Sequence, residues 1–326
     1  MSVRILVVGA GSIGARHAAA VAAHQGAKLA GVVDPDPARR PTCVAGFSTL
    51  DAVDTPVDAA IIATPTATHA EIGAACAARG WAILVEKPIA ETVAEADRLI
   101  EACAAARVPL LVGHHRRQHG VVAAARAALD AGAIGRVIGV SAIWAVKKHD
   151  GYFDAPWRRG AGGSPTLINI VHDIDLLRHL MGEIASVHPV LAAAKDDPER
   201  ETAGALALSF ASGAVGTILF SDNAPSPWSF EAATGENAEI AQGGDDAYRF
   251  IGTRGALGFP SLTLWSGAED WTEAPARTQL EAPPVKPPLP LQLDHLIEVV
   301  EGRAKPLCTG EDGRETLRTA LRVLGL

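Results

Sequence analysis

The stretch Val3-Arg4-Ile5-Leu6-Val7-Val8-Gly9-Ala10-Gly11-Ser12-Ile13-Gly14 determines the fold expected for the first part of the chain. Its first six residues are β-rich and carry a single charge, which predicts a buried strand. The spacing of Gly9, Gly11 and Gly14 allows a tight turn, a close approach to a pyrophosphate and the packing of a helix on that strand. The alanine-rich residues Ser12 to Ala23 predict this helix, whose N-terminal amides can bind phosphate. We therefore expect a strand–turn–helix unit that accepts a dinucleotide.

An acidic residue follows the second predicted strand at the distance expected for a ribose contact. Residues Lys28 to Val33 predict this strand, and Asp34 comes 20 residues after Gly14. A carboxylate accepts hydrogen bonds from a ribose diol and repels a 2′-phosphate, so the sequence favours NAD. Arg39 and Arg40 could accept such a phosphate if their loop folds back, which leaves NADP open. The alternative is an ordinary strand-to-helix turn followed by an ordinary acid.

A second apolar run, Trp81 to Pro88, ends in two opposite charges and a proline. Such runs are typical of central parallel strands that are covered on both faces. Ligands in open α/β sheets bind outside the carboxyl ends of the strands. We therefore expect Lys87 to face this crevice beside Glu86, where its ammonium group can act as a proton donor.

The loop after a further predicted strand, Val57 to Ala63, should reach the same crevice. Its residues Thr64, Pro65 and His69 are candidates for the nicotinamide side of the site. Thr68 can equally cap the helix that follows, and both interpretations stay open. The complete set of candidate cofactor residues is Gly9, Gly11, Ser12, Ile13, Gly14, Asp34, Thr64, Pro65, His69, Glu86 and Lys87.

The chain changes character after residue 119. Residues 1–119 predict an α/β domain with a doubly wound parallel sheet, whereas short β-leaning segments at 136–146, 202–210, 214–221 and 248–252 follow. Ala211 to Gly213 has the composition of a hairpin loop. Hairpins in place of alternating helices indicate a mostly antiparallel sheet. We therefore expect an α+β domain with an open sheet over residues 120–326.

The most polar candidate of the second domain is a predicted helix from Thr166 to Leu180. Asn169, His172 and Asp175 follow one another at three-residue steps and would share one stripe beside a buried apolar face. Asn, His and Asp side chains that hydrogen-bond one another can hold an imidazole ready as a base near neutral pH. A structural role for this histidine is the alternative.

The loop before this helix combines aromatic and cationic side chains, which suit a hydroxylated or carboxylated small molecule. The candidate substrate residues are Lys148, Tyr152, Trp157, Arg158, Asn169 and His172, with His295 as a further candidate near the end of the chain. The number of cations favours an acidic or lactone-forming sugar. A subunit interface is an alternative for the Trp and Arg residues, and both uses can coexist.

Composition limits the class of protein. The chain has 326 residues, of which 48% are hydrophobic and 20% charged, so it can form two cores. Its net charge of -8 provides no basic surface, so we expect neither nucleic acid nor a membrane as a partner. The four cysteines form no Cys-x-x-Cys pair, which favours a reducing, cytoplasmic setting. No leader and no uncharged run of membrane-spanning length is recognised, so we expect a soluble protein.

One basic cluster has to be weighed as a metal site. His115 and His119 have the i, i+4 spacing of a helical metal pair. Arg116 and Arg117 lie between them, and no Cys or acid completes the site, so we expect no metal. Contacts of the two arginines with cofactor or substrate oxygens are the favoured interpretation, and a solvated turn is the alternative.

Three motifs together resemble the Gfo/Idh/MocA oxidoreductase family: Gly9-x-Gly11-x-x-Gly14, Glu86-Lys87-Pro88 and His172-Asp173-Ile174-Asp175. The resemblance spans nearly the whole chain. It implies a Rossmann domain followed by an open antiparallel sheet that often forms dimers or tetramers, and NAD- or NADP-dependent chemistry on sugars, inositols and related polyols. It also implies that Lys87 and His172 are catalytic. The family often has an Asp four residues before the histidine, where this chain has Ile168, and Asn169 is a candidate replacement.

These observations predict an NAD(P)-dependent dehydrogenase acting on a CH–OH group of a sugar, sugar acid or cyclic polyol, in a homodimer or homotetramer. His172 would take the hydroxyl proton, oriented by Asp175, while Lys87 polarises the developing oxyanion. One alternative is an NAD-dependent glycosidase that oxidises, eliminates and re-reduces its substrate. Another is a non-catalytic NAD sensor with a degenerate site.

Overall fold

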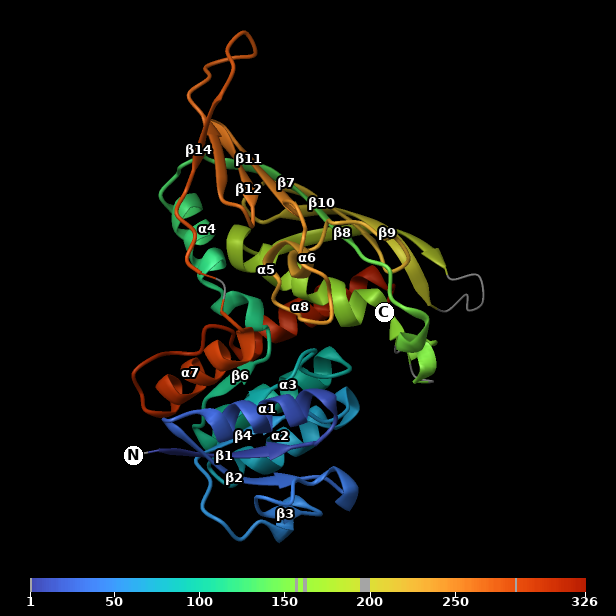
Figure 1. Cartoon of the computed structure of the whole chain (residues 1–326), viewed down its shortest axis with the longest axis vertical. Helices are drawn as coiled ribbons and strands as arrows, with labels where there is room; N and C mark the ends of the chain where they lie inside the picture. Colours follow the sequence, from blue (N-terminus) through green and yellow to red (C-terminus); the bar gives the residue numbers. More distant parts are fainter. Residues whose placement is uncertain (1, 156–157, 161–162, 194–199, 285) are drawn as a thin grey trace. The chain divides into compact units, whose positions relative to one another are not determined.

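The computed structural model describes residues 2–155, 158–160, 163–193, 200–284 and 286–326. They fold as two compact units. The first unit comprises Met1–Gln118 and Pro287–Arg318, and the second comprises His119–Lys286 and Thr319–Leu326 (Figure 1). Residues 287–318, which we expected in the second domain, belong to the first unit.

The first unit contains a six-stranded parallel sheet in the order β3-β2-β1-β4-β5-β6. This order reverses between β1 and β4, which is the topology of a doubly wound dinucleotide-binding fold and confirms the predicted fold class. The strands are β1 (Val3–Val8), β2 (Ala27–Val33), β3 (Gly46–Phe47), β4 (Ala59–Ile62), β5 (Ala82–Val85) and β6 (Leu110–Val112).

Both faces of this sheet are covered, as the apolar runs predict. Val3, Ile5 and Val7 pack in one core with helices α1 and α7, whereas Leu6 and Val8, which point to the opposite face, are equally buried. The helices of the unit are α1 (Ser12–Ala23), α2 (His69–Ala77), α3 (Val93–Ala106), α7 (Pro288–Val300) and the first part of α8 (Gly310–Val323).

Helix α7 explains why the C-terminal segment joins the first unit. Its residues Leu293, Leu296 and Ile297 are buried in the core that contains β1. At the surface, His24 Nε2 at the end of α1 lies 2.8 Å from Asp294 Oδ1. This segment also engages Arg117, whose guanidinium donates to the carbonyl oxygen of Leu307 at 3.0 Å. Arg117 therefore holds the returning chain, and a contact of this arginine with a ligand stays a prediction.

The second unit contains an eight-stranded sheet in the order β14-β13-β12-β11-β7-β10-β9-β8. Its neighbouring strands are antiparallel except for β10 and β7, which confirms the predicted mostly antiparallel sheet. The strands are β7 (Val137–Ala145), β8 (Ile184–Ala193), β9 (Glu201–Phe210), β10 (Val215–Ser221), β11 (Tyr248–Gly252), β12 (Gly255–Phe259), β13 (Thr263–Ser266) and β14 (Ala276–Gln279).

Helices cover one face of this sheet and leave the other exposed (Figure 1). They are α4 (Gly120–Asp130), α5 (Val171–Met181) and α6 (Phe230–Thr234), with the π-helix η8 (Thr166–Ile170) preceding α5. Along β10, Ile218 and Phe220 are buried in the core, whereas Val215 and Leu219 alternate with them and are exposed. The exposed face also carries Val190 on β8 and Ile251 on β11.

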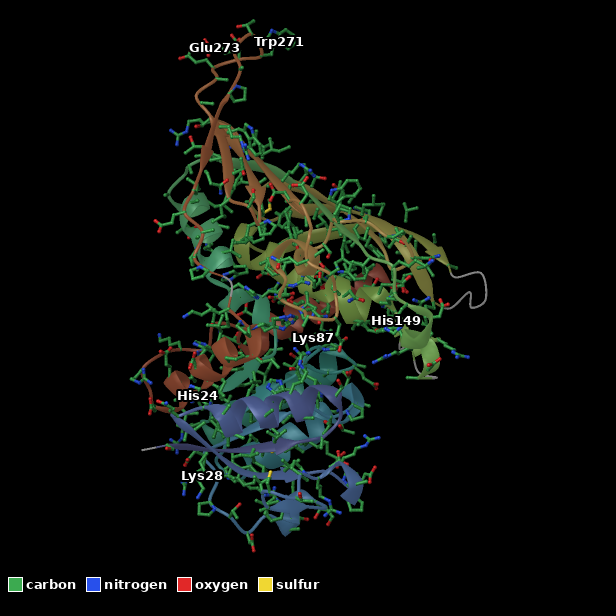
Figure 2. The ribbon with its side chains drawn as sticks, viewed as in Figure 1. His24, Lys28, Lys87, His149, Trp271 and Glu273 are labelled. Atoms are coloured by element: carbon green, nitrogen blue, oxygen red, sulfur yellow. The ribbon has the colours of Figure 1, made fainter. Side chains whose placement is uncertain are left out.

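The connection between β13 and β14 extends away from the sheet, and Trp271 and Glu273 lie near its tip (Figure 2). The Trp271 side chain is 97% exposed there. None of the helices in the described part of the chain has the length and apolar character needed to span a membrane.

Candidate active site

The glycine turn after β1 has the geometry that its sequence predicts. Gly9 has a φ of +91°, and a Cβ atom at this position would lie 2.6 Å from the carbonyl oxygen of Ala63. A Cβ atom on Gly14 would lie 1.9 Å from the carbonyl oxygen of Gly9, so helix α1 needs glycine there to approach the turn. At Gly11, by contrast, such a Cβ would meet no atom of the described residues within 4 Å, apart from those of its two chain neighbours. The turn therefore leaves open space where a pyrophosphate can approach the backbone.

Asp34 at the end of β2 is held beside this turn. Its carboxylate accepts hydrogen bonds from the backbone nitrogens of Ala10 at 2.8 Å and Asp36 at 2.9 Å. A carboxylate has about four lone-pair positions, so two bonds leave capacity for a ribose diol. The turn, the N-terminus of α1 and Asp34 thus fit a bound dinucleotide. Ser12 and Ile13 form the first residues of α1 and are exposed and partly exposed, respectively.

Lys87 follows the carboxyl end of β5 and is anchored through its neighbour Glu86. Glu86 Oε2 accepts a hydrogen bond from the Lys87 backbone nitrogen at 3.2 Å, and Glu86 Oε1 lies 2.8 Å from His17 Nε2. Burial raises the pKa of Glu86, but the hydrogen bond and charge of His17, with the charges of Lys87 and His115, lower it to about 2. Glu86 is therefore an anion that joins helix α1 to the strand end carrying the lysine.

Sequence reasoning missed His17, although a signal was present. This histidine comes three residues after Gly14, so it lies on the face of α1 that packs against the sheet. Its ring is 2% exposed and makes its contact 69 residues away in the sequence, at Glu86. A polar residue on the packed face of the phosphate-binding helix needs a buried partner, and Glu86 is that partner.

His69 joins two loops at the same edge of the sheet. Its Nδ1 lies 3.0 Å from the carbonyl oxygen of Pro88 and its Nε2 lies 2.9 Å from that of Thr64. Burial lowers the pKa of His69, against the opposing effect of these two carbonyls. The ring is 1% exposed, so it fixes the loops after β4 and β5. Pro65, in the first of these loops, is exposed.

The capping alternative for Thr68 is wrong. Its hydroxyl oxygen lies 2.8 Å from Thr64 Oγ1 and 2.8 Å from the carbonyl oxygen of Pro65, and it makes no capping bond to helix α2. The short 3-10 helix η3 (Thr66–Thr68) runs directly into α2, so Thr68 already has helical backbone angles and its side chain turns back on the loop. Thr92 and Glu95, three residues apart, have the sequence signature of a capping box, and both of its hydrogen bonds are present at the start of α3.

In the second unit, the helix that carries His172 does not begin as predicted. A π-helix over Thr166–Ile170 precedes α5, and its wider turn changes the angular phase between Asn169 and His172. Glu201 holds this first turn, because its Oε1 accepts hydrogen bonds from Ser164 Oγ at 2.6 Å and from the Thr166 backbone nitrogen at 2.9 Å. Single π-turns inside helices are frequent at functional sites.

The predicted apolar face of this helix is buried, with Ile170, Ile174 and Leu177 each 0% exposed. His172, Asp173 and Asp175 are 8%, 1% and 1% exposed, and the apolar Ile174 between them is buried too. Asp173 accepts a hydrogen bond from the Tyr248 hydroxyl on β11. The polar residues at the start of α5 are therefore buried together with the apolar ones.

The predicted substrate loop brings three of its candidates together. Lys148 Nζ lies 4.6 Å from the centre of the Tyr152 ring, and the Arg158 guanidinium carbon lies 4.2 Å from the same centre. Trp157 lies outside the described residues. His295 belongs to the first unit, where its Nε2 accepts a hydrogen bond from the Leu307 backbone nitrogen at 2.9 Å. That histidine therefore positions the returning chain.

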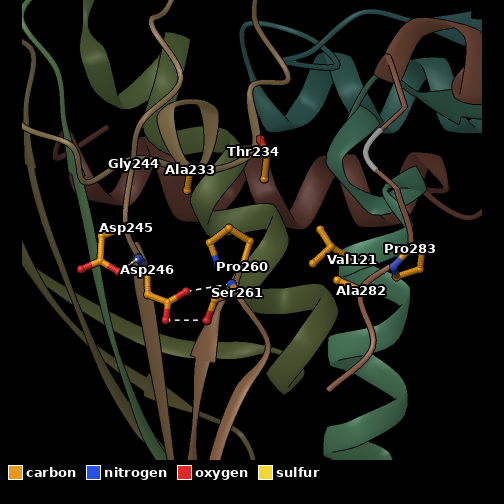
Figure 3. A pocket seen from close by; sticks show the side chains of 10 residues that line it. All are labelled: Val121, Ala233, Thr234, Gly244, Asp245, Asp246, Pro260, Ser261, Ala282 and Pro283. Atoms are coloured by element: carbon orange, nitrogen blue, oxygen red, sulfur yellow. Dashed lines mark hydrogen bonds between the residues drawn. The ribbon is translucent and has the colours of Figure 1, made fainter. Parts of the chain in front are cut away.

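Two further features of the second unit lie apart from these candidates. A cavity of about 180 Å³ is lined by residues such as Thr234, Asp246 and Ser261 (Figure 3). The Asp246 carboxylate there accepts bonds from the Ser261 backbone nitrogen and hydroxyl, both at 2.8 Å, so it has a structural role. No group of three or more potential metal ligands is found among the described residues, and His119 Nε2 lies 3.1 Å from Glu236 Oε2.

A doubly wound dinucleotide-binding unit joined to an α+β unit defines a class of two-domain oxidoreductase-like proteins. Comparison with known families makes this specific. Residues 3–114 match the oxidoreductase family with an NAD-binding Rossmann fold, and residues 122–258 match the GFO/IDH/MocA C-terminal domain. The chain belongs to the Gfo/Idh/MocA family, and its first unit is the NAD-binding Rossmann domain of that family.

Individual relatives include an inositol 2-dehydrogenase from Rhizobium meliloti (strain 1021), 32% identical over 189 residues that cover 56% of each chain. A 1,5-anhydro-D-fructose reductase from Ensifer adhaerens is 29% identical and aligns over 83% of this chain and 78% of its own length. The chain spans about half the length of several curated relatives that it matches. An aldose-aldose oxidoreductase structure from Caulobacter crescentus shares the fold, with a TM-score of 0.78, 23% identity and coverage of 100% and 98% of the two chains.

Proposed function

We propose that the protein is an NAD-dependent dehydrogenase that oxidises or reduces a CH–OH group of a sugar or polyol. The observation that carries this proposal is the turn after β1, where open space above Gly11 and the anchored carboxylate of Asp34 fit a dinucleotide. Asp34 repels a 2′-phosphate, which supports NAD over NADP. The relatives named above are a dehydrogenase and a reductase, which favours this function over a glycosidase or a sensor.

Bound NAD would supply or accept the hydride. Lys87, fixed through Glu86, places an ammonium group at the strand end where it can stabilise a developing alkoxide. His172 accepts the hydroxyl proton as a general base, and Asp175 orients its ring. Asn169 contacts the substrate in place of the acid that the family often has at the position of Ile168. These roles are our proposals for the individual residues.

We further propose that the protein works in the cytoplasm as a homodimer or homotetramer. The apolar side chains on the open face of the eight-stranded sheet, such as Val215, Leu219 and Ile251, support an oligomer because such a face is expensive to leave in water. The sequence has four cysteines but no Cys-x-x-Cys pair, which supports a reducing compartment. Sedimentation equilibrium tests the oligomeric state, and a monomer at micromolar concentration would contradict the proposed dimer or tetramer.

The activity is tested by following NADH and NADPH formation with aldoses, polyols and sugar acids. With a substrate in hand, Lys87→Ala and His172→Ala should each lower kcat by about 10² to 10⁴, the usual contribution of a positioned acid or base. NAD affinity, measured by titration calorimetry, should stay close to that of the wild type. Wild-type turnover in both variants would contradict the assigned roles.

A further inference from the structure

Lys148 is a buried cation whose ammonium group makes no hydrogen bond to any described residue. Its side chain is 6% exposed, and the nearest carboxylate oxygen, Asp222 Oδ2, is 3.6 Å from Nζ. An ammonium group has three N–H donors, and buried donors are nearly always satisfied. Among the described residues, the Lys148 ammonium group therefore has no hydrogen-bond acceptor, and a bound ligand can provide one.

The carboxylate of Asp222 already forms an ion pair with a second cation. The Arg200 guanidinium donates a hydrogen bond to the same Asp222 oxygen, and both of these side chains are almost fully buried. One buried carboxylate thus faces two buried cations. The rings of Tyr152 and Trp144 lie 4.6 Å and 6.0 Å from Lys148 Nζ and give it favourable contacts, but aromatic rings do not satisfy N–H donors as oxygen atoms do.

The energetic cost of this arrangement points to a ligand. A cation removed from water loses its hydration and regains that free energy only from close, well-directed anions. Burial accordingly lowers the pKa of Lys148 to about 8, although the charge of Asp222 acts in the opposite direction. An apolar side chain of similar volume would fill this space with a smaller loss of hydration free energy, which favours a functional role for the amine.

The cation cluster is joined by direct contacts to the helix that carries His172. Arg200 Nε donates to the carbonyl oxygen of Gly163 at 3.3 Å, and the next residue, Glu201, holds Ser164 and the Thr166 backbone at the start of η8. In the same turn, Thr166 Oγ1 and Asn169 Oδ1 are buried without a hydrogen-bond partner among the described residues. Polar groups that await a partner therefore extend from the cluster towards His172 along the chain.

We propose that Lys148 binds a carboxylate of the substrate, so that the enzyme acts on sugar acids in preference to neutral sugars. This inference rests on the dehydrogenase function proposed above. A carboxylate is favoured over a phosphate because the two cations Lys148 and Arg200 share the single anion Asp222, which leaves one net positive charge and matches a single negative charge on the ligand. The substrate carboxylate supplies the acceptors that Lys148 Nζ lacks.

The test compares matched compounds that differ only at one carbon: an aldose, its uronic acid and its 6-phosphate, in the gluco, galacto and manno series. NADH formation gives kcat/KM for each. We expect the uronic acid to exceed its neutral partner by about tenfold or more, and Lys148→Met to reduce this ratio by about ten- to hundredfold, the loss typical of a hydrogen bond to a charged group.

Lys147→Met is the matched control, because it removes the same charge from the adjacent, exposed lysine and should leave the ratio unchanged. Lys148→Arg retains the charge and should keep part of the preference, which separates loss of the cation from misfolding. A neutral sugar used as well as its acid overturns the inference but leaves the dehydrogenase function standing. A preferred sugar phosphate overturns the carboxylate assignment. Absence of NADH formation with all compounds overturns the proposed function and this inference with it.

Discussion

The buried carboxylate of Glu86 should make the stability of the protein depend on pH in a defined window. Its pKa is about 2 in the folded protein, against 4.5 for an ordinary glutamate. A depressed pKa stabilises the folded state at pH values above 4.5, the pKa of this group in the unfolded chain. That stabilisation is lost as the pH falls towards 2, the pKa in the folded protein. The shift of about 2.5 pH units corresponds to about 3 kcal/mol near neutral pH, because one unit is about 1.4 kcal/mol.

The perturbation is Glu86→Gln, which keeps the size of the side chain and removes its charge. At pH 3 only about one unit of the shift remains, so the contribution of Glu86 falls to about 1 kcal/mol. The difference in unfolding free energy between wild type and variant should therefore narrow by about 2 kcal/mol between pH 6 and pH 3. Urea denaturation followed by circular dichroism measures it at each pH.

Glu91→Gln provides the control, since it is the same chemical change at an exposed position five residues away. It should leave the unfolding free energy nearly constant relative to wild type over this range. If the Glu86→Gln difference is the same at pH 6 and pH 3, the His17–Glu86 contact does not hold an ionised carboxylate, and the proposed anchoring of Lys87 loses its basis.

Two further predictions concern the glycine turn and the buried lysine. Gly14→Ala should lower Tm by several degrees and weaken NAD binding, because its Cβ would meet the Gly9 carbonyl oxygen. Gly11→Ala should retain the wild-type Tm and weaken only NAD binding. Thermal unfolding measures Tm and titration calorimetry measures NAD affinity, so the two variants can be distinguished. The acid-to-neutral ratio of kcat/KM should fall as the pH rises through about 8, since Lys148 loses its proton there, and a flat ratio from pH 7 to pH 9.5 would contradict its role. The charged or titratable side chains around this ammonium group are Tyr152, Arg158, Arg200 and Asp222.

Local patterns in the sequence predicted much of the first unit. The strand Val3–Val8 and the helix Ser12–Ala23 have the expected bounds, because apolar runs and glycine spacing act over neighbouring residues. The capping box at Thr92 is equally local and was found. The sheet order follows from the alternation of strands and helices, so the fold class could be inferred without any long-range contact.

Contacts between residues distant in the sequence could not be read in this way. The partner of Glu86 is His17. Lys148 pairs with Asp222, the residue after β10, and the η8 turn is held by Glu201 at the start of β9. No periodicity links these segments. The π-helix was missed for a related reason: its wide turn is supported by Glu201, which lies 35 residues further along the chain than Thr166. The roles of the individual site residues remain predictions.

Helix α7 has a consequence for how the protein is made. Its buried leucines complete the core around β1, yet the ribosome synthesises them after residues His119–Lys286 of the second unit. The amino-terminal half therefore emerges with an apolar surface that only the last part of the chain can cover. A nascent chain stalled before residue 287 should be a client of chaperones and a target for proteolysis, and the Rossmann half should not be obtainable by simple C-terminal truncation.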